Sequence, residues 1–191
     1  METINWIKNY VENQKNVLES LPIDTISDCI HVVRNKYLEG KKIFVFGNGG
    51  SASNASHFVT DLGKSSSDLM RNKFNVLSLN DNISWITAIA NDYNYNDIYR
   101  KQLQNYGSRG DLVITLSVSG NSPNIIEACR WAKTNGIEIM AFTGSGGGLL
   151  AKLADKLIVV NSNHYGRVED CQMTICHLLC YAFVELEELR C

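Results

Sequence analysis

The chain has 191 residues, of which 45% are hydrophobic and 20% are charged, and its formal net charge is −2. This length suits a single domain with a sizeable core, and the near-neutral charge gives no reason to expect a nucleic-acid partner. The N-terminus does not resemble a signal peptide and no apolar run approaches the roughly 20 residues that span a bilayer, so we expect a cytoplasmic protein without a membrane partner.

Two helices are predicted before the first strand. Apolar residues recur at helical spacing over residues 3–20, and Pro22 interrupts the pattern. In the second helix, Asp24 is expected to cap the start and Gly40 to end it. Such a hairpin must bury its apolar stripe, and a neighbouring subunit is the natural place. We therefore expect residues 1–40 to serve oligomerisation.

Residues 41–61 read KKIFVFGNGGSASNASHFVTD and predict a strand, a glycine turn and the start of a helix. Glycines let the backbone approach a ligand, and the first turn of a helix presents unpaired N–H groups to an anion. The turn matches neither G-x-G-x-x-G nor G-x-x-x-x-G-K-[ST], which disfavours a nucleotide cofactor. A plain structural turn is the alternative, and we favour a phosphate site.

Strands and helices alternate through the rest of the chain. Further strands are predicted at 72–79, 111–116, 137–143 and 156–160, and helices at 80–90, 96–106, 123–136, 149–154 and about 167–189. Asn91 and Asp92 are expected to break the first of these helices. Short, nearly continuous apolar strands are typical of a parallel sheet covered on both faces. The fold class is therefore α/β, a doubly wound five-stranded parallel sheet whose ligands bind beyond the carboxyl ends of the strands.

Two further loops follow predicted strands with polar or small residues. The loop 117–122 offers the hydroxyls of Ser117, Ser119 and Ser122 together with a helix start, so it can hold a phosphate without lysine or arginine. Alternatively, Ser122 merely caps the helix ahead of Pro123. That interpretation leaves the other two serines unexplained, so we favour the phosphate. The loop 144–148 is less informative and is interpreted as a flexible turn.

Two pairs of titratable residues fall on predicted helices. His57 and Asp61 are four residues apart and share a face, which suits metal binding or proton transfer as well as a solvated surface. Glu169 and His177 are eight apart and separated by about 12 Å of axial rise. Glu169 and His177 are therefore expected to lie on either side of one substrate. They can bind one metal ion together only if the start of the helix is irregular. A lone histidine in an apolar run is more often a core residue.

The cysteines form no C-x-x-C pair and are expected to be reduced thiols. Three of them fall in the apolar part of the last helix, where a thiolate metal site is disfavoured because free cysteine behaves as a small hydrophobic residue. The six residues are Cys29, Cys129, Cys171, Cys176, Cys180 and Cys191.

The segments GNGGSASNASHF, AIANDYNYND and SVSGNSPN, with Glu169 and His177 on the last helix, together resemble the sugar isomerase (SIS) domain and, more closely, the phosphoheptose isomerase family. The resemblance covers residues 1–191 as a single SIS domain, with the hairpin at 1–40 and a phosphosugar-binding core at 41–191. It implies an aldose–ketose isomerase that converts sedoheptulose 7-phosphate to D-glycero-D-manno-heptose 7-phosphate through an enediol, for lipopolysaccharide or capsule. It also implies a homotetramer with active sites near subunit interfaces.

The resemblance also implies roles for individual residues. Asp61 stands where the family has a glutamate base, and it is shorter by roughly 1–1.5 Å of reach. His177 matches the proton donor, and Glu169 stands where glutamine is usual. His57, Asp61, Glu169 and His177 are all zinc-compatible ligand types, so Zn²⁺ is predicted, without a redox cofactor. The expected substrate contacts are Asn48, Gly49, Gly50, Ser51, Asn91, Asp92, Ser117, Val118, Ser119, Ser122 and Glu169.

Two other functions stay open from the sequence. An isomerase of another phosphosugar is favoured by Asp61 and by Val118, where family members often carry threonine. A catalytically silent SIS-type protein that binds a phosphosugar or regulates a partner is favoured by the changed base. Because His57 and His177 are retained, we place the heptose isomerase first and the silent protein last.

Overall fold

The computed structural model describes residues 1–190, in which five parallel strands form one sheet of order β2-β1-β3-β4-β5. The doubly wound parallel sheet expected from the sequence is therefore confirmed. The central strands consist almost wholly of buried residues, which explains their unbroken apolar sequences. The strands are β1 (Lys42–Gly47), β2 (Asn75–Ser78), β3 (Leu112–Ser117), β4 (Glu138–Thr143) and β5 (Lys156–Val159).

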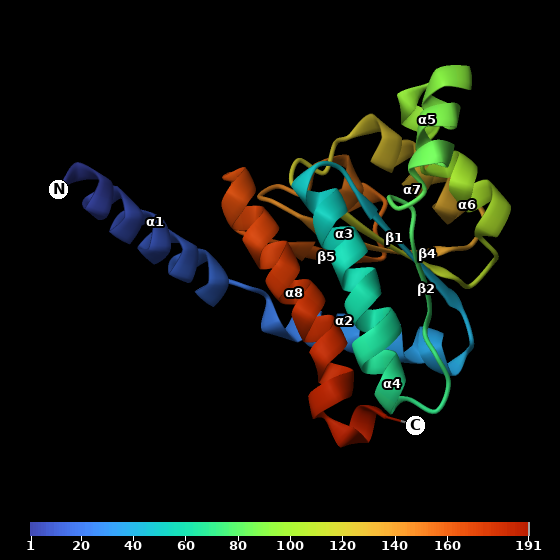
Figure 1. Ribbon diagram of the computed structural model, residues 1–191, viewed down its shortest axis with the longest axis horizontal. Coiled ribbons are helices and arrows are strands. Elements are labelled where there is room, and N and C mark those ends of the chain that lie inside the picture. Colours follow the sequence, from blue (N-terminus) through green and yellow to red (C-terminus); the bar gives the residue numbers. More distant parts are fainter. Residues whose placement is uncertain (191) are drawn as a thin grey trace.

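Helices cover both faces of the sheet (Figure 1). On one face, α2 (Ile23–Leu38), α3 (Gly50–Asp61) and α8 (Tyr165–Glu185) pack over Ile43 and Val45 of β1. On the other face, α5 (Ile83–Asp92), α6 (Arg100–Tyr106) and α7 (Pro123–Thr134) pack over Phe44 and Phe46. The shorter helical segments are η1 (Leu62–Ser66), α4 (Ser67–Leu69), η2 (Tyr95–Asp97), η3 (Gly148–Lys152) and η4 (Glu187–Leu189).

The chain reverses its direction of travel across the sheet between β1 and β3. The connection from β1 through α3 leads outward to β2, whereas the connection from β3 through α7 leads to β4 on the opposite side. The loops that leave β1 and β3 therefore diverge onto opposite faces and leave a crevice between them, which is where ligands bind in open α/β sheets. The glycine turn and the serine loop lie at this point.

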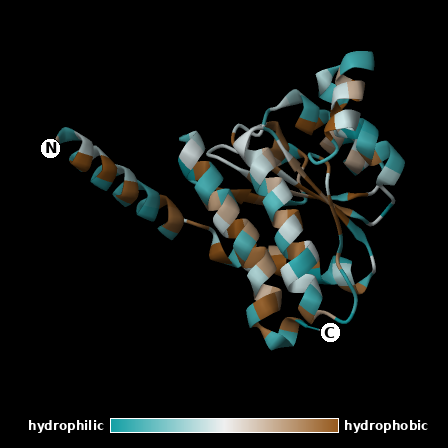
Figure 2. Cartoon of the chain, in the orientation of Figure 1, coloured by the Kyte–Doolittle hydropathy of each residue, from teal (hydrophilic) through white to brown (hydrophobic). Residues whose placement is uncertain are grey.

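The first helix, α1 (Glu2–Glu19), extends away from the body of the molecule (Figure 1). None of residues 2–19 is buried, although apolar residues are spread along the helix (Figure 2). Ile4, Ile7 and Val11 are 58%, 49% and 50% exposed. The hairpin therefore leaves a stripe of apolar side chains at spacings of three and four residues in contact with solvent.

Several expected boundaries are wrong. Pro22 occupies the N-cap position of α2, so Asp24 lies within its first turn instead of capping it. The helix expected to end before Asn91 continues through Asp92, because the Tyr93 N–H bonds to Ile89 O at 3.0 Å and closes a last turn. The helix expected at 96–106 is split into η2 and α6, the one at 149–154 is the shorter 3₁₀ segment η3, and α8 ends before η4.

Within residues 1–190, no helix combines the length and apolarity needed to cross a bilayer. The five cysteines in this range are buried free thiols, as expected from the sequence, and Cys191 lies outside the described residues.

Candidate active site

The glycine turn lies between β1 and α3 and is shaped by backbone contacts. A Cβ atom on Gly47 would lie 2.8 Å from the carbonyl oxygens of Leu116 and Ser51, so a side chain does not fit there. Gly49 adopts a φ of +57° and precedes the first turn of α3. The turn therefore brings β1 and β3 close together and presents the N-terminus of a twelve-residue helix to the crevice.

The serine loop after β3 directs hydroxyl groups toward the same crevice. The Oγ atoms of Ser117 and Ser119 accept hydrogen bonds from the backbone N–H groups of Gly120 and Asn121, each at 3.2 Å. Both hydroxyl protons are therefore left for a ligand, which suits an anion. A cavity of about 70 Å³ lies here, lined by Asn48, Ser51, Leu116, Ser117, Val118, Ser119, Ser122, Tyr165 and Glu169.

The loop 144–148 supports the serine loop, which corrects its interpretation as a flexible turn. Gly144 N–H donates to Val118 O at 2.9 Å, and Leu150 N–H donates to Gly120 O at 3.1 Å. Gly148 has a φ of +56°, and a Cβ atom there would lie 2.5 Å from Ser119 O. Glycine is therefore required at this point by both backbone conformation and space.

Three of the four predicted metal or acid–base residues lie together. The Asp61 carboxylate is 3.3 Å from His57 Nε2 and 3.6 Å from His177 Nε2. The two imidazole rings are 5.3 Å apart, centroid to centroid, and steeply inclined. Asp61 is 16% exposed, whereas His57 and His177 are 51% and 42% exposed. The packing of α3 against α8 thus assembles a carboxylate and two imidazoles that are open to solvent.

These three residues offer ligand atoms within 4.8 Å of one another and can accept a metal ion. Two imidazoles and one carboxylate suit Zn²⁺. Glu169, the fourth expected ligand, does not belong to this cluster, which among residues 1–190 consists of His57, Asp61 and His177. Its carboxylate packs against Gly50 at the start of α3, one side of the small cavity. The eight-residue spacing on a regular helix accounts for this separation.

The other expected substrate residues differ in position. Asn91 and Asp92 are exposed at the end of α5, where Asn91 Nδ2 donates to Asp92 Oδ1 at 2.9 Å. The Ser51 hydroxyl is 2% exposed and donates to Gln172 Oε1 at 2.8 Å, and Gln172 in turn bonds to Phe142 O. Sequence reasoning missed Gln172, whose signal is a polar residue in the apolar run of the last helix.

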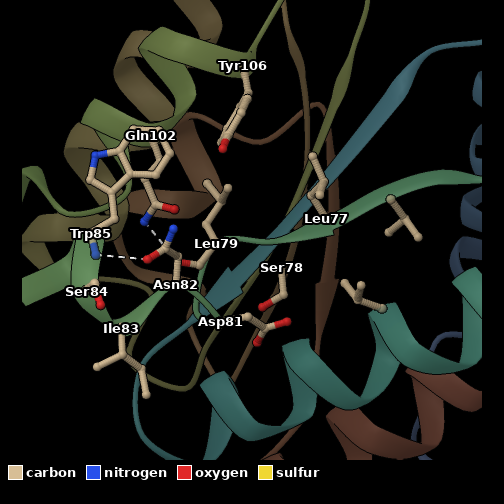
Figure 3. Close-up of a pocket in the computed structure, with 12 residues that line it drawn as sticks. Leu77, Ser78, Leu79, Asp81, Asn82, Ile83, Ser84, Trp85, Gln102 and Tyr106 are labelled. Atoms are coloured by element: carbon tan, nitrogen blue, oxygen red, sulfur yellow. Dashed lines mark hydrogen bonds between the residues drawn. The ribbon is translucent and has the colours of Figure 1, made fainter.

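A larger groove of about 590 Å³ lies beside the edge strand β2. Figure 3 shows Trp85, Tyr106 and Leu77 around it, with Asn82 Oδ1 accepting a hydrogen bond from the backbone N–H of Trp85 at 3.0 Å. Its lining within residues 1–190 includes none of the predicted site residues, and Asp81 is its sole charged member. The crevice at the ends of β1 and β3 is therefore the candidate active site.

Comparisons with known proteins show the family to which the chain is similar. Residues 5–144 match the SIS domain family. A protein of Thermoplasma acidophilum described as "Probable phosphoheptose isomerase" is 37% identical over 91% of this chain and 94% of its own length. The phosphoheptose isomerase of Aneurinibacillus thermoaerophilus is 37% identical over 95% of this chain and 93% of that protein. The structure of a phosphoheptose isomerase from Francisella tularensis superposes with a TM-score of 0.88 at 26% identity, over 96% of this chain and 98% of that chain.

Proposed function

Because the chain belongs to the phosphoheptose isomerase family of SIS-domain proteins, we propose that it interconverts sedoheptulose 7-phosphate and D-glycero-D-manno-heptose 7-phosphate. The observation that carries this function is the pairing of the Asp61 carboxylate with the His177 imidazole, 3.6 Å apart, on helices that flank a phosphate-type loop. A carboxylate and an imidazole are the groups that an enediol proton transfer requires.

The phosphate of the substrate binds in the crevice between the glycine turn and the serine loop. The hydroxyl protons of Ser117 and Ser119 and the N-terminus of α3 supply donors to it. From Gly50, where α3 begins, His57 is about 10 Å further along the axis and Asp61 about 16 Å, at 1.5 Å per residue. His57 and Asp61 thus lie about two and three helical turns from the start of α3, where we place the phosphate.

Asp61 removes the proton from the carbon beside the carbonyl, and His177 handles the proton on the carbonyl oxygen. Reprotonation at the neighbouring carbon then completes the aldose–ketose exchange. Glu169 lies against Gly50 and lines the small cavity, which supports its expected contact with the substrate. The chemistry needs neither a redox cofactor nor a nucleotide.

A zinc ion fits the donor set of His57, Asp61 and His177, which are the ligands that we propose for it. When bound, the ion supplies Lewis acidity toward a substrate oxygen.

We propose that the active protein is a homotetramer. The stripe of Ile4, Ile7 and Val11 on α1 is unburied within one copy of the chain, and a second copy covers it. The five described cysteines are unpaired, in keeping with a reducing, cytoplasmic compartment.

The test is to incubate the purified protein with sedoheptulose 7-phosphate in deuterated water and to follow the sugar by NMR and mass spectrometry. We expect the aldose to form, with label at the carbon next to the carbonyl. Saturable binding of the phosphosugar without turnover or exchange would overturn the isomerase and point to the silent binding protein. That alternative is disfavoured because a carboxylate and an imidazole, the groups that an enediol proton transfer requires, lie together in the Asp61–His177 pair.

A further inference from the structure

The side chain of Asn48 in the glycine turn is held by a second asparagine across the crevice. Asn48 Nδ2 donates to Asn124 Oδ1 and Asn48 Oδ1 accepts from Asn124 Nδ2, both at 2.9 Å. Asn124 lies in the first turn of α7 and is 2% exposed. The two amides therefore form a reciprocal pair that joins the loop after β1 to the helix after the serine loop.

A neighbouring backbone N–H group determines which way the two amides of this pair face. The backbone N–H of Ile125 donates to Asn124 Oδ1 at 3.0 Å, so the Asn124 oxygen must face that donor. A reciprocal amide pair allows one orientation of the second amide once the first is set. The Asn48 side-chain oxygen therefore faces the Asn124 NH₂ group.

Tyr99 supports Asn48 from the core. It is 1% exposed, and its ring stacks on Phe46 at 4.6 Å between centroids. Its hydroxyl accepts from Asn80 Nδ2 at 2.8 Å, donates to Gly47 O and lies 3.1 Å from Asn48 Oδ1. Burial raises the pKa of Tyr99, so the hydroxyl stays protonated and remains a donor.

We propose that Asn124 and Tyr99 are positioning residues of the phosphosugar site and act through Asn48. Asn124 occupies one lone pair of Asn48 Oδ1 and one N–H of its Nδ2, and the Tyr99 hydroxyl oxygen lies 3.1 Å from the same Oδ1. The second N–H of Asn48 Nδ2 is left for the ligand, so Asn48 can donate to an acceptor atom such as a phosphate or carbonyl oxygen. This inference rests on the proposed function, because that function places the substrate in this crevice.

A double-mutant cycle tests the proposal. Tyr99→Phe removes one hydroxyl, and Tyr106→Phe, at the end of α6, is the matched control with a 41% exposed side chain. In the otherwise unchanged enzyme, we expect Tyr99→Phe to raise KM for sedoheptulose 7-phosphate about three- to tenfold, with kcat within about twofold. In the Asn48→Ala background, the same change should move KM by less than about twofold, because Tyr99 acts through Asn48.

An equal rise in KM in both backgrounds, or none in the first, would overturn the proposal, since a purely structural role does not depend on Asn48. Asn124→Ser is the second variant and is judged by the same cycle if Tyr99→Phe does not fold. Absence of turnover by the wild-type protein would count against the proposed function alone. The cycle is then repeated with the affinity for inorganic phosphate, measured by calorimetry, in place of KM. The same fold-changes in the two backgrounds then test whether Tyr99 and Asn124 act through Asn48.

Discussion

Asp61 lies between His57 and His177, because its carboxylate is within 3.6 Å of both imidazoles. We predict that Asp61→Asn lowers kcat by about 100-fold or more, since the amide keeps the shape but cannot accept the substrate proton. The measurement is the rate of deuterium incorporation. Asp61→Glu retains a carboxylate and should keep a measurable rate. An Asn variant with more than a tenth of the wild-type rate would exclude Asp61 as the base.

The metal prediction concerns His57. We expect His57→Ala to lower the zinc content, measured by atomic absorption after dialysis, because it removes one of three clustered donors. Glu169→Ala is the matched control, since Glu169 packs at Gly50, outside the cluster. Equal zinc loss in both variants would return Glu169 to the ligand set. Full zinc content in His57→Ala would exclude this cluster as the metal site.

The buried cysteines give a prediction about reactivity. Burial raises the pKa of Cys29 to about 11 and that of Cys129 to about 12, so few thiolates form at pH 8. In a Cys191→Ser background, iodoacetamide at that pH should modify none of the five remaining thiols of the native protein and all five in denaturant, as counted by mass spectrometry. Rapid modification of either residue in the native protein would contradict the buried environment.

At the scale of residues, the sequence predicts contacts within one helix and misses those between helices. The four-residue spacing of His57 and Asp61 places them together on any regular helix. The approach of His177 to the same carboxylate depends on the packing of α3 against α8, which no spacing within α8 encodes. The separation of Glu169 from His177, by contrast, follows from their eight-residue spacing on one regular helix.

Among the elements, the loop 144–148 fixes the shape of the serine loop. We predict that Gly146→Ala costs about 1–2 kcal/mol, because its φ is +85° but a Cβ meets open space. Gly148→Ala has the same penalty from its φ of +56° and adds a contact of 2.5 Å with Ser119 O. It should therefore destabilise the protein more and weaken phosphate binding, whereas Gly146→Ala leaves phosphate binding intact.

Thermal unfolding and calorimetric titration with phosphate measure the two effects. Equal phosphate affinity in Gly146→Ala and Gly148→Ala would show that the serine loop does not depend on the loop 144–148.

Element types were predictable because glycine and proline mark most of the turns, whereas the boundaries between residues 80 and 106 were not. Asn80, Asp81 and Asn82 are all suitable helix caps by sequence. The structure uses Asn82 as the cap, while Asn80 bonds to Gly47 and Tyr99. The choice among three local candidates is thus made by Gly47, at the end of β1, and by Tyr99, at the N-cap of α6, which lie elsewhere in the chain.

At the scale of the whole molecule, two apolar surfaces within residues 1–190 bear on the assembly of the subunits. One is the stripe of Ile4, Ile7 and Val11 on α1. The other is a groove of about 620 Å³ between α2 and α8, whose lining includes His177, Leu178 and Tyr181. Because His177 lies both in this groove and in the Asp61 cluster, we expect assembly of the subunits and completion of the active site to be coupled.

The prediction that follows is that Ile7→Glu dissociates the oligomer and lowers kcat at the same time. A charge in the middle of the stripe opposes burial of that face against another copy. Light scattering coupled to size exclusion measures the mass, and the isomerase rate is followed against protein concentration. Lys8→Glu, on the adjacent exposed position of α1, is the control that should leave both unchanged. A fully active monomer would show that the acid–base cluster is complete within one chain, and an unchanged oligomer would show that the subunits meet through another surface.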